Sequence, residues 1–241
     1  MAGKVKPESR AYRSPLRADR AQQTRRKVLE SARRLFVERG YAGTTVASVA
    51  DLAGVSPETI YLSLGGKRGL LEGVMEITGP HDSAADDEGW WRMVVELPSA
   101  AERLDKMVEY SCRILARTRP IHAIIRGAAD NEAFAGALGR KLLAERLTNQ
   151  TDRIRRYLGG ELRPGLSIAE AGERYCVLLS PELYHLLIVE LGWTAKRHER
   201  WLIELLRTEL LGLGDPELVD RRSDRRPKQG RSAVSMRQPK S

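Results

Sequence analysis

Residues that bind metals or perform catalysis are scarce in this chain. Its 241 residues include two cysteines and four histidines. The cysteines, Cys112 and Cys176, lie far apart without a paired spacing, which favours a reducing compartment and a role as small core residues. The histidines form no His-Glu-x-x-His motif, and no carboxylate cluster has metal-ligand spacing. We therefore predict a protein that is not an enzyme and that uses no metal ion and no cofactor.

Two further absences limit the fold and the location. Aromatic residues make up 5% of the chain, and no apolar run approaches the roughly 18 to 20 residues that a membrane span needs. The first residues are charged and lack the apolar segment of a signal peptide. Alternating Val, Ile and Thr runs with hairpin turns are missing, whereas the helix formers Ala, Leu, Arg and Glu dominate. These features predict an all-α protein of the cytoplasm with no membrane partner.

The formal net charge of +9 is distributed unevenly along the chain. Residues 1–70 hold 14 Lys and Arg against 6 Asp and Glu, residues 71–213 hold 19 against 22, and residues 214–241 hold 8 against 4. Cations gathered in one region displace counterions from phosphates. The distribution therefore favours binding of nucleic acid by the N-terminal part of the chain.

The segment from Gly40 to Leu71 contains the pattern of two short helices joined by a glycine turn. Thr45 is placed to cap the first helix, and Gly54 is placed to end it in a left-handed conformation. Ser56 is placed to cap the second helix, and small apolar residues at helical spacing predict that the two helices cross closely. This pattern is typical of a helix-turn-helix, whose second helix enters the major groove of double-stranded DNA.

The same segment resembles the DNA-binding domain of the TetR family of bacterial transcriptional regulators. The matching residues are Gly40, Tyr41, Thr45, Val49, Ala50, Ala53, Gly54, Val55, Ser56, Thr59, Ile60, Tyr61, Lys67 and Leu70. The resemblance implies phosphate contacts for Thr45, Ser56, Tyr61 and Lys67. It implies positions that face bases for Pro57, Glu58, Thr59 and Leu62.

The chain departs from the family pattern in two places. Ser63-Leu64 stands where the family usually has His-Phe or Tyr-Phe, and Gly65-Gly66 stands where Ser or Thr often precedes the lysine. Because paired glycines allow many backbone conformations, we expect a looser loop into the following helix.

Composition divides the chain into four segments. We predict a disordered basic arm over residues 1–19, a helix-turn-helix DNA-binding domain over 20–66, a helical effector-binding and dimerisation domain over 67–213, and a disordered basic tail over 214–241. An alternative for the arm is that its arginines reach into the adjacent minor groove. Helices are predicted over 20–39, 67–77, 99–118, 131–158 and 195–211, with others after Pro120, after Ser167 and up to Gly192. Residues 81–89 are predicted to form an acidic loop.

The last two predicted helices are rich in leucine, and we expect them to pack against a second copy of the chain. Two recognition helices about 34 Å apart would read a palindromic operator. The resemblance implies the same homodimer, and it implies a cavity for a small-molecule effector. Candidate residues for that cavity, chosen by helix position alone, are Met107, Tyr110, Ser111, Ile125, Phe134, Tyr175 and Leu179. Each of them also suits an ordinary core.

The sequence thus favours a homodimeric DNA-binding transcriptional regulator, and in particular a repressor that leaves its operator when an effector binds. An effector-independent, nucleoid-type DNA-binding protein is the alternative. The central helical region of about 140 residues favours the first hypothesis, because dimerisation alone needs fewer residues.

Overall fold

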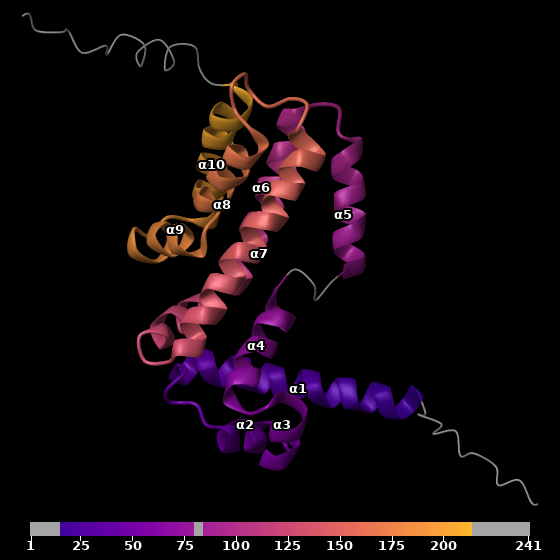
Figure 1. Ribbon diagram of the computed structural model, residues 1–241, viewed down its shortest axis with the longest axis vertical. Helices are drawn as coiled ribbons and strands as arrows, with labels where there is room; N and C mark the ends of the chain where they lie inside the picture. Colours follow the sequence, from indigo (N-terminus) through magenta and orange to yellow (C-terminus); the bar gives the residue numbers. More distant parts are fainter. Residues whose placement is uncertain (1–14, 80–83, 214–241) are drawn as a thin grey trace, which may run out of the picture.

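The protein is all-α throughout the residues that the computed structural model describes, 15–79 and 84–213. Its elements are α1 (Pro15–Arg39), α2 (Val46–Ala53), α3 (Pro57–Leu64), α4 (Lys67–Thr78), α5 (Ala84–Glu96), α6 (Ala100–Ala129), α7 (Ala133–Leu158), α8 (Ile168–Leu178), α9 (Pro181–His185), the π-helix η2 (Leu186–Glu190) and α10 (Ala195–Leu211). Figure 1 shows α1 to α4 at one end of an elongated molecule, with α6 and α7 running away from them. We call residues 15–79 the head and residues 84–213 the bundle. The predicted fold class is confirmed.

One apolar cluster holds the four helices of the head together. Leu29 and Phe36 of α1, Val49 and Ala50 of α2 and Ile60 of α3 are fully buried in it. Leucines of α4 also belong to it, and apolar residues of α6 and α7 extend it into the bundle. Ala50 leaves room for the second helix because its side chain is a single methyl group. The predicted close crossing of α2 and α3 therefore follows from small residues at the contact.

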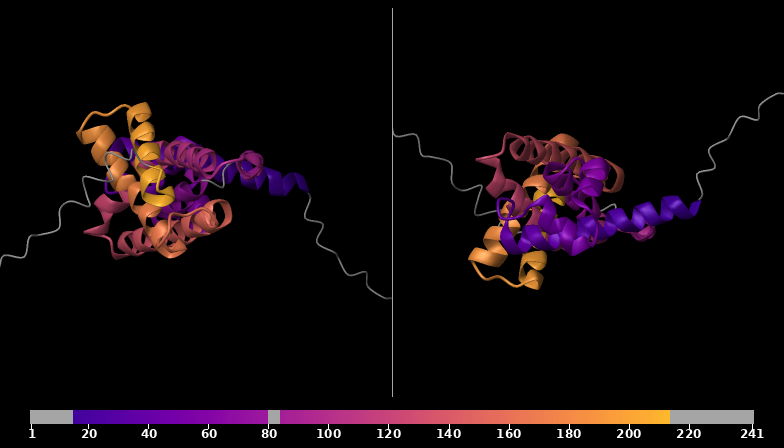
Figure 2. Two further views of the ribbon diagram at one scale, coloured as in Figure 1. Left: turned by 90° about the horizontal axis from the view of Figure 1, so that it is seen from above. Right: turned by 90° about the horizontal axis from the view of Figure 1, so that it is seen from below.

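The first helix begins earlier than the sequence predicts. α1 starts at Pro15, five residues before the predicted start at Arg20. Proline is well tolerated at the first position of a helix because its missing N–H would have no partner there. In views along the long axis, the start of α1 extends beyond the other helices (Figure 2). Residues 1–14 of the predicted arm and the predicted tail over 214–241 lie outside the described residues.

Two segments of the bundle also differ from the prediction. α6 continues through Pro120 to Ala129, where the sequence predicts an end near Thr118 and a separate short helix. Leu115 and Ile121, on either side of the proline, are both buried in apolar clusters, and this packing outweighs one missing hydrogen bond.

The predicted acidic loop over 81–89 is helical from Ala84 onward, because α5 begins there. The stretch includes Ala84 and Ala85, and alanine has the highest helix propensity, which outweighs the loop preference that the acidic run suggests.

A second apolar cluster forms the core of the bundle. It takes Leu104 and Met107 from α6, Ile154 from α7, Tyr175 from α8 and Leu202 from α10. The predicted bounds of α10 are confirmed. Within the described ranges, no helix is both long enough and apolar enough to cross a membrane.

Candidate nucleic-acid interface and adjoining cavity

Hydrogen bonds at helix ends build the turn between α2 and α3. The backbone N–H of Ser48 donates to Thr45 Oγ1 at 3.0 Å, and the backbone N–H of Thr45 donates to Ser48 Oγ at 3.1 Å. Gly54 then ends α2 with a φ of 66°, a left-handed conformation that glycine adopts without strain. Ser56 Oγ accepts from the backbone N–H of Thr59 at 3.3 Å. The predicted roles of Thr45 and Ser56 at helix starts and of Gly54 at a helix end are confirmed.

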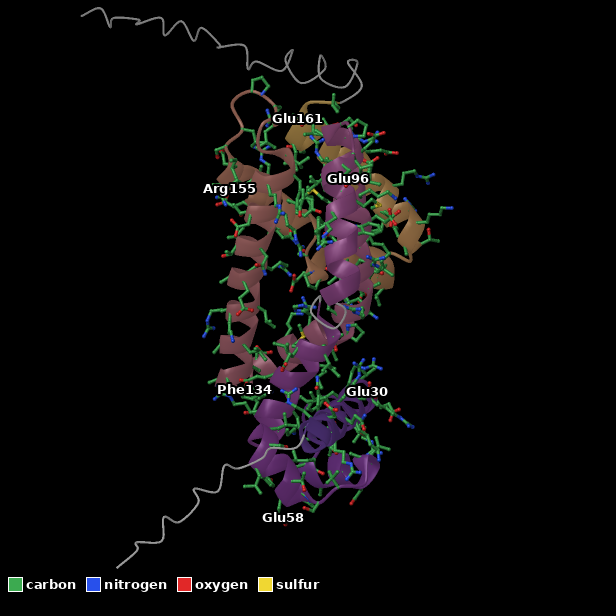
Figure 3. All side chains as sticks on the ribbon, turned by 90° about the vertical axis from the view of Figure 1, so that its right-hand side faces the viewer. Glu30, Glu58, Glu96, Phe134, Arg155 and Glu161 are labelled. Carbon is green, nitrogen blue, oxygen red and sulfur yellow. The ribbon has the colours of Figure 1, made fainter. Side chains whose placement is uncertain are left out.

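α3 presents a group of exposed side chains at one end of the molecule. Tyr61 is 58% exposed and Leu62 is 89% exposed. Glu58 and Thr59 are also exposed, while Pro57 is half-buried at the first helical position. Figure 3 shows Glu58 at the extreme end of the head, away from the bundle. The residues for which base contacts are predicted therefore share one accessible helix.

Glu58 carries a negative charge at neutral pH. A hydrogen bond from its own backbone N–H and a second one from the Ser56 hydroxyl lower the pKa of its carboxyl below the ordinary value of 4.5. A carboxylate in the major groove accepts a hydrogen bond from the amino group of cytosine. Glu58 is thus suited to reading a base rather than to binding a phosphate.

Lys67, for which a phosphate contact is predicted, also supports the head. Its Nζ lies 4.2 Å from the centre of the Tyr41 ring and donates to the Ala42 carbonyl oxygen at 3.4 Å. Burial lowers the pKa of the Lys67 ammonium, and the charge of Glu132 opposes this effect. Lys67 therefore joins the start of α4 to the chain between α1 and α2.

The connection from α3 to α4 is tight. Gly65 and Gly66 alone separate the two helices, with φ values of 72° and 89°. The Gly65 N–H donates to the Tyr61 carbonyl oxygen at 3.0 Å, and a Cβ atom on Gly66 would lie 3.0 Å from Cε1 of Tyr61. The looser loop that the sequence predicts is therefore wrong. The two glycines permit a sharp turn with positive φ, and they let the Tyr61 ring lie close to the backbone.

Cations of α1 lie beside the helix-turn-helix. Arg25 and Arg26 each form an ion pair with a glutamate. Lys27 forms no ion pair within the part of the chain that the structure describes. Its Nζ lies 3.6 Å from the place where a Cβ atom on Gly54 would stand, next to the turn between α2 and α3. Lys27 therefore places a positive charge without an ion pair, among the described residues, next to this turn.

A cavity of about 610 Å³ lies between the head and the bundle. Ser63 and Leu64, at the end of α3, line it together with residues of α4, α6 and α7. The end of α3, the helix that is suited to enter DNA, therefore forms part of the cavity lining.

The structure brings some of the predicted effector-site residues to this cavity. Tyr110, Ser111 and Leu179 line it. Tyr175 lies behind this wall, where its hydroxyl shares a hydrogen bond of 3.1 Å with Ser111 Oγ. Burial is the main cause that raises the pKa of the Tyr175 hydroxyl, so this group stays protonated.

The other predicted effector-site residues lie away from the cavity lining. Met107 and Ile125 are buried in the two apolar clusters. Phe134 packs against Tyr41, with ring centres 5.6 Å apart, where α7 meets the head (Figure 3). The position of a residue on a helix does not by itself identify a cavity-lining residue, because several faces of the long helices are buried.

Sequence reasoning missed three polar residues of α7 that line the cavity. Arg146, Gln150 and Arg153 are spaced by four and three residues, which places them on one helix face. The apolar residues Leu142 and Ile154 lie at the two ends of this polar face. A row of polar residues at helical spacing between two apolar residues was the sequence signal that indicates such a lining.

His122 also lines the cavity, on the α6 side. Burial, together with the charge of Arg146, lowers the pKa of the His122 imidazole to about 4. The imidazole is therefore neutral at pH 7. Within residues 15–79 and 84–213, no group of His, Cys, Asp and Glu side chains is arranged to hold a metal ion.

The helix-turn-helix region matches a known protein family. Residues 28–74 match the family described as bacterial regulatory proteins, tetR family. The HTH-type transcriptional regulator TtgR of Pseudomonas putida is 33% identical to this chain over 113 residues. That alignment covers 44% of this chain and 51% of TtgR, so the chain spans about half the length of this relative.

Solved structures share the fold of the head and of the bundle. Native NalD, the secondary repressor of the MexAB-OprM multidrug efflux pump in Pseudomonas aeruginosa, has a TM-score of 0.59 and 17% identity, over 79% of this chain and 98% of NalD. A complex of SmeT with triclosan has a TM-score of 0.62 and 19% identity, over 79% of this chain and 92% of SmeT. At such identities the likeness establishes the fold.

Proposed function

We propose that this chain, which belongs to the TetR family of bacterial regulatory proteins, is a transcriptional repressor that binds a palindromic operator as a homodimer and leaves it when a small-molecule effector binds. The observation that carries the proposal is the position of α3, a capped helix with exposed side chains at the extreme end of the head. Such a helix fits the major groove of DNA. The relative TtgR is a transcriptional regulator and the structural neighbour NalD is a repressor, which supports the same role here.

The proposed DNA contacts fall into two groups. Phosphates are contacted by Thr45, Ser56, Tyr61 and Lys67, with Lys27 as an addition from α1. Bases are contacted by Pro57, Glu58, Thr59 and Leu62. Phosphate contacts supply affinity for any duplex, whereas base contacts select the sequence.

In the proposed effector response, a ligand in the cavity contacts residues of α3 and α4 that line it. We propose that the boundary between the DNA-binding domain and the effector-binding domain lies at residue 66, as the sequence predicts. α4 packs into the core of the head, but its Glu72 and Glu76 line the cavity. Arg117 of α6 donates to the carbonyl oxygens of Thr78, at 2.8 Å, and of Gly79, and so ties the end of α4 to the bundle. A ligand that binds better to one arrangement of α4 than to another would change the DNA affinity of the head.

The proposed dimer uses an exposed apolar surface on α8 and η2. The expectation that the leucines of α10 pack against a second copy is wrong for Leu202, Leu206 and Leu210, because they are buried within the core of their own chain. Val177 is 66% exposed, and Leu186, Val189 and Leu191 are exposed as well. Val177→Asp should convert the dimer into monomers in analytical sedimentation, because a charge would be buried at the contact. Val95→Asp, at an exposed valine of α5, should leave the dimer intact, and a monomeric parent protein would refute this contact.

Selection from random duplex DNA, followed by gel-shift titration at several salt concentrations, tests the DNA-binding proposal. We expect an inverted repeat to be enriched. Lys67→Ala should weaken binding to every sequence and lower the salt slope by about 1, whereas Lys196→Ala on α10 should change neither. Thr59→Val should change the selected sequence more than the affinity. Binding without any enriched sequence would favour the nucleoid-type alternative, and absence of binding would overturn both.

A further inference from the structure

Two positive charges in the lining of the cavity have no negative partner within the described part of the chain. The acidic lining residues Glu72, Glu76 and Glu145 each form an ion pair, with Arg68, Arg25 and Lys141 respectively, at distances of 3.1, 2.9 and 3.8 Å. Arg146 and Arg153 form no ion pair with any carboxylate among the residues that the structure covers. The cavity therefore keeps cationic charge in a partly desolvated place, where an anion would neutralise it.

The contacts that these two arginines do make position them without neutralising them. The guanidinium of Arg153 lies 4.6 Å from the centre of the Trp91 ring and 5.3 Å from that of Tyr110. Arg146 Nε donates to Cys176 Sγ at 3.5 Å. Stacking on aromatic faces restricts a guanidinium while leaving its N–H groups available, and a guanidinium matches the two oxygens of a carboxylate.

Gln150 lies on the same face of α7, between the two arginines. Gln150 is 6% exposed, and its Oε1 has no hydrogen-bond partner among residues 15–79 and 84–213. A buried polar atom without a partner is unfavourable, and such atoms in native proteins often mark a place for a ligand or an ordered water. Because a half-turn of the carboxamide exchanges its oxygen and nitrogen, Gln150 can offer an acceptor or a donor to a bound molecule.

Apolar side chains form another part of the lining, next to polar and paired charged ones. Leu115 of α6, Leu138 and Leu142 of α7 and Met75 of α4 contribute to it. The neutral His122 adds no charge at pH 7, and its lowered pKa reflects in part the positive charge of Arg146. A ligand that satisfies the whole cavity therefore has a compact anionic group at α7 and an apolar portion toward α4 and α6.

From this lining we propose that the cavity binds an amphipathic organic carboxylate, whose carboxylate is held by Arg146 and Arg153 with Gln150 between them. The inference names the chemical class of the effector and so rests on the proposed function.

Paired probes that differ in charge alone test the proposal on the full-length protein. Isothermal titration calorimetry would compare decanoate with decanamide, and 4-phenylbutyrate with 4-phenylbutanamide. We expect each carboxylate to bind at least about tenfold more tightly than its amide, which corresponds to about 1.4 kcal/mol. Carboxylates that bind no better than their amides, or that do not bind, would overturn the proposal.

Variants of α7 assign the preference to the two arginines. Arg146→Gln and Arg153→Gln should each remove most of the preference for decanoate over decanamide. Arg155→Gln should preserve it, because Arg155 is exposed on the same helix, is paired with Asp152 and does not line the cavity. Thermal unfolding of every variant would verify that it folds, and the assignment can be judged from Arg146→Gln alone if Arg153→Gln does not fold. A preference unchanged in Arg146→Gln would count against the assignment.

Gel-shift titration of the same preparations separates this inference from the proposed function. If the protein binds DNA but shows no preference for carboxylates, the inference fails and the DNA-binding function stands. If the protein prefers carboxylates but binds no DNA, the proposed function fails and the chemistry of the cavity stands.

Discussion

The head and the bundle differ in how completely they satisfy their buried polar groups. Three buried side-chain atoms lack a hydrogen-bond partner in the described chain, namely Trp90 Nε1, Gln150 Oε1 and His198 Nε2, and all of them belong to the bundle. In the head, Thr45 and Ser56 supply the helix caps. Satisfied polar groups favour one conformation, whereas an unsatisfied group beside a cavity, such as Gln150 Oε1, leaves a region responsive to a ligand.

Crowded glycines on helices occur in both regions, since a Cβ atom on Gly172 of α8 would overlap Thr151, but a crowded site in the head and an open site in the bundle can be compared directly. A Cβ atom on Gly69 of α4 would overlap the Leu64 carbonyl oxygen, and one on Gly73 would lie 2.6 Å from Leu29 Cδ2. Gly127 of α6, in the bundle, has no neighbour within 4 Å of such an atom. The head therefore depends on close backbone approach at α4, which no other residue type allows.

The largest effect that we expect comes from Gly69→Ala. Because the added methyl group would meet main-chain atoms of α3, the variant should lose about 3 kcal/mol of stability and most of its DNA affinity. Chemical denaturation followed by circular dichroism, with a gel-shift titration, would measure both. Gly127→Ala should instead stabilise the protein by about 0.5–1 kcal/mol, as alanine does in an open helix interior. Equal stability of the two variants would contradict the contrast.

Acidification should weaken the bundle before the head. The folded pKa of His122 is lowered from 6.5 to about 4 by burial and by Arg146, and burial also lowers that of His198. As the pH falls, the imidazoles of the unfolded chain therefore bind protons before those of the folded chain. The contribution of the neutral histidines to the stability of the folded state is present above pH 6.5 and is lost as the pH falls toward 4. For His122 the loss is at most about 3 kcal/mol. Residues 1–79 contain no histidine.

Tryptophan fluorescence can follow this loss, because all four tryptophans lie between residues 90 and 201 and thus in the bundle. The urea midpoint should fall between about pH 7 and about pH 5 in the parent protein. In His122→Gln the fall should be smaller. A midpoint that is constant over this range would show that burial of His122 does not determine the stability of the bundle.

Gln150→Leu should have a small effect, which is a gain in stability. Leucine has a similar size and removes a buried oxygen without a partner, so the free energy of unfolding should rise by about 1 kcal/mol. Differential scanning calorimetry would detect the gain as a shift of a few degrees. Asn149→Leu, at the exposed neighbouring position, should change stability by less than about 0.5 kcal/mol. A loss of stability in Gln150→Leu would mean that the side chain is already satisfied, for example by water.

The parts of the site that were predictable depend on short-range interactions. The bonds of Thr45 and Ser56 join residues three positions apart, and the left-handed turn at Gly54 concerns one residue. Such contacts can be recognised in any window of the sequence that contains both partners. The tight two-glycine turn before α4 was not predictable in this way, because its shape depends on the ring of Tyr61 and on the helix that follows.

The sequence by itself determined the all-α class, the cationic N-terminal part and the capped helix-turn-helix, since periodicity, charge and capping act over a few residues. Only the tertiary structure decided that α6 continues through Pro120 and that Arg146, Gln150 and Arg153 face a cavity beside α3. These outcomes depend on which surfaces of distant helices meet, and packing between them outweighs the preference of any single residue.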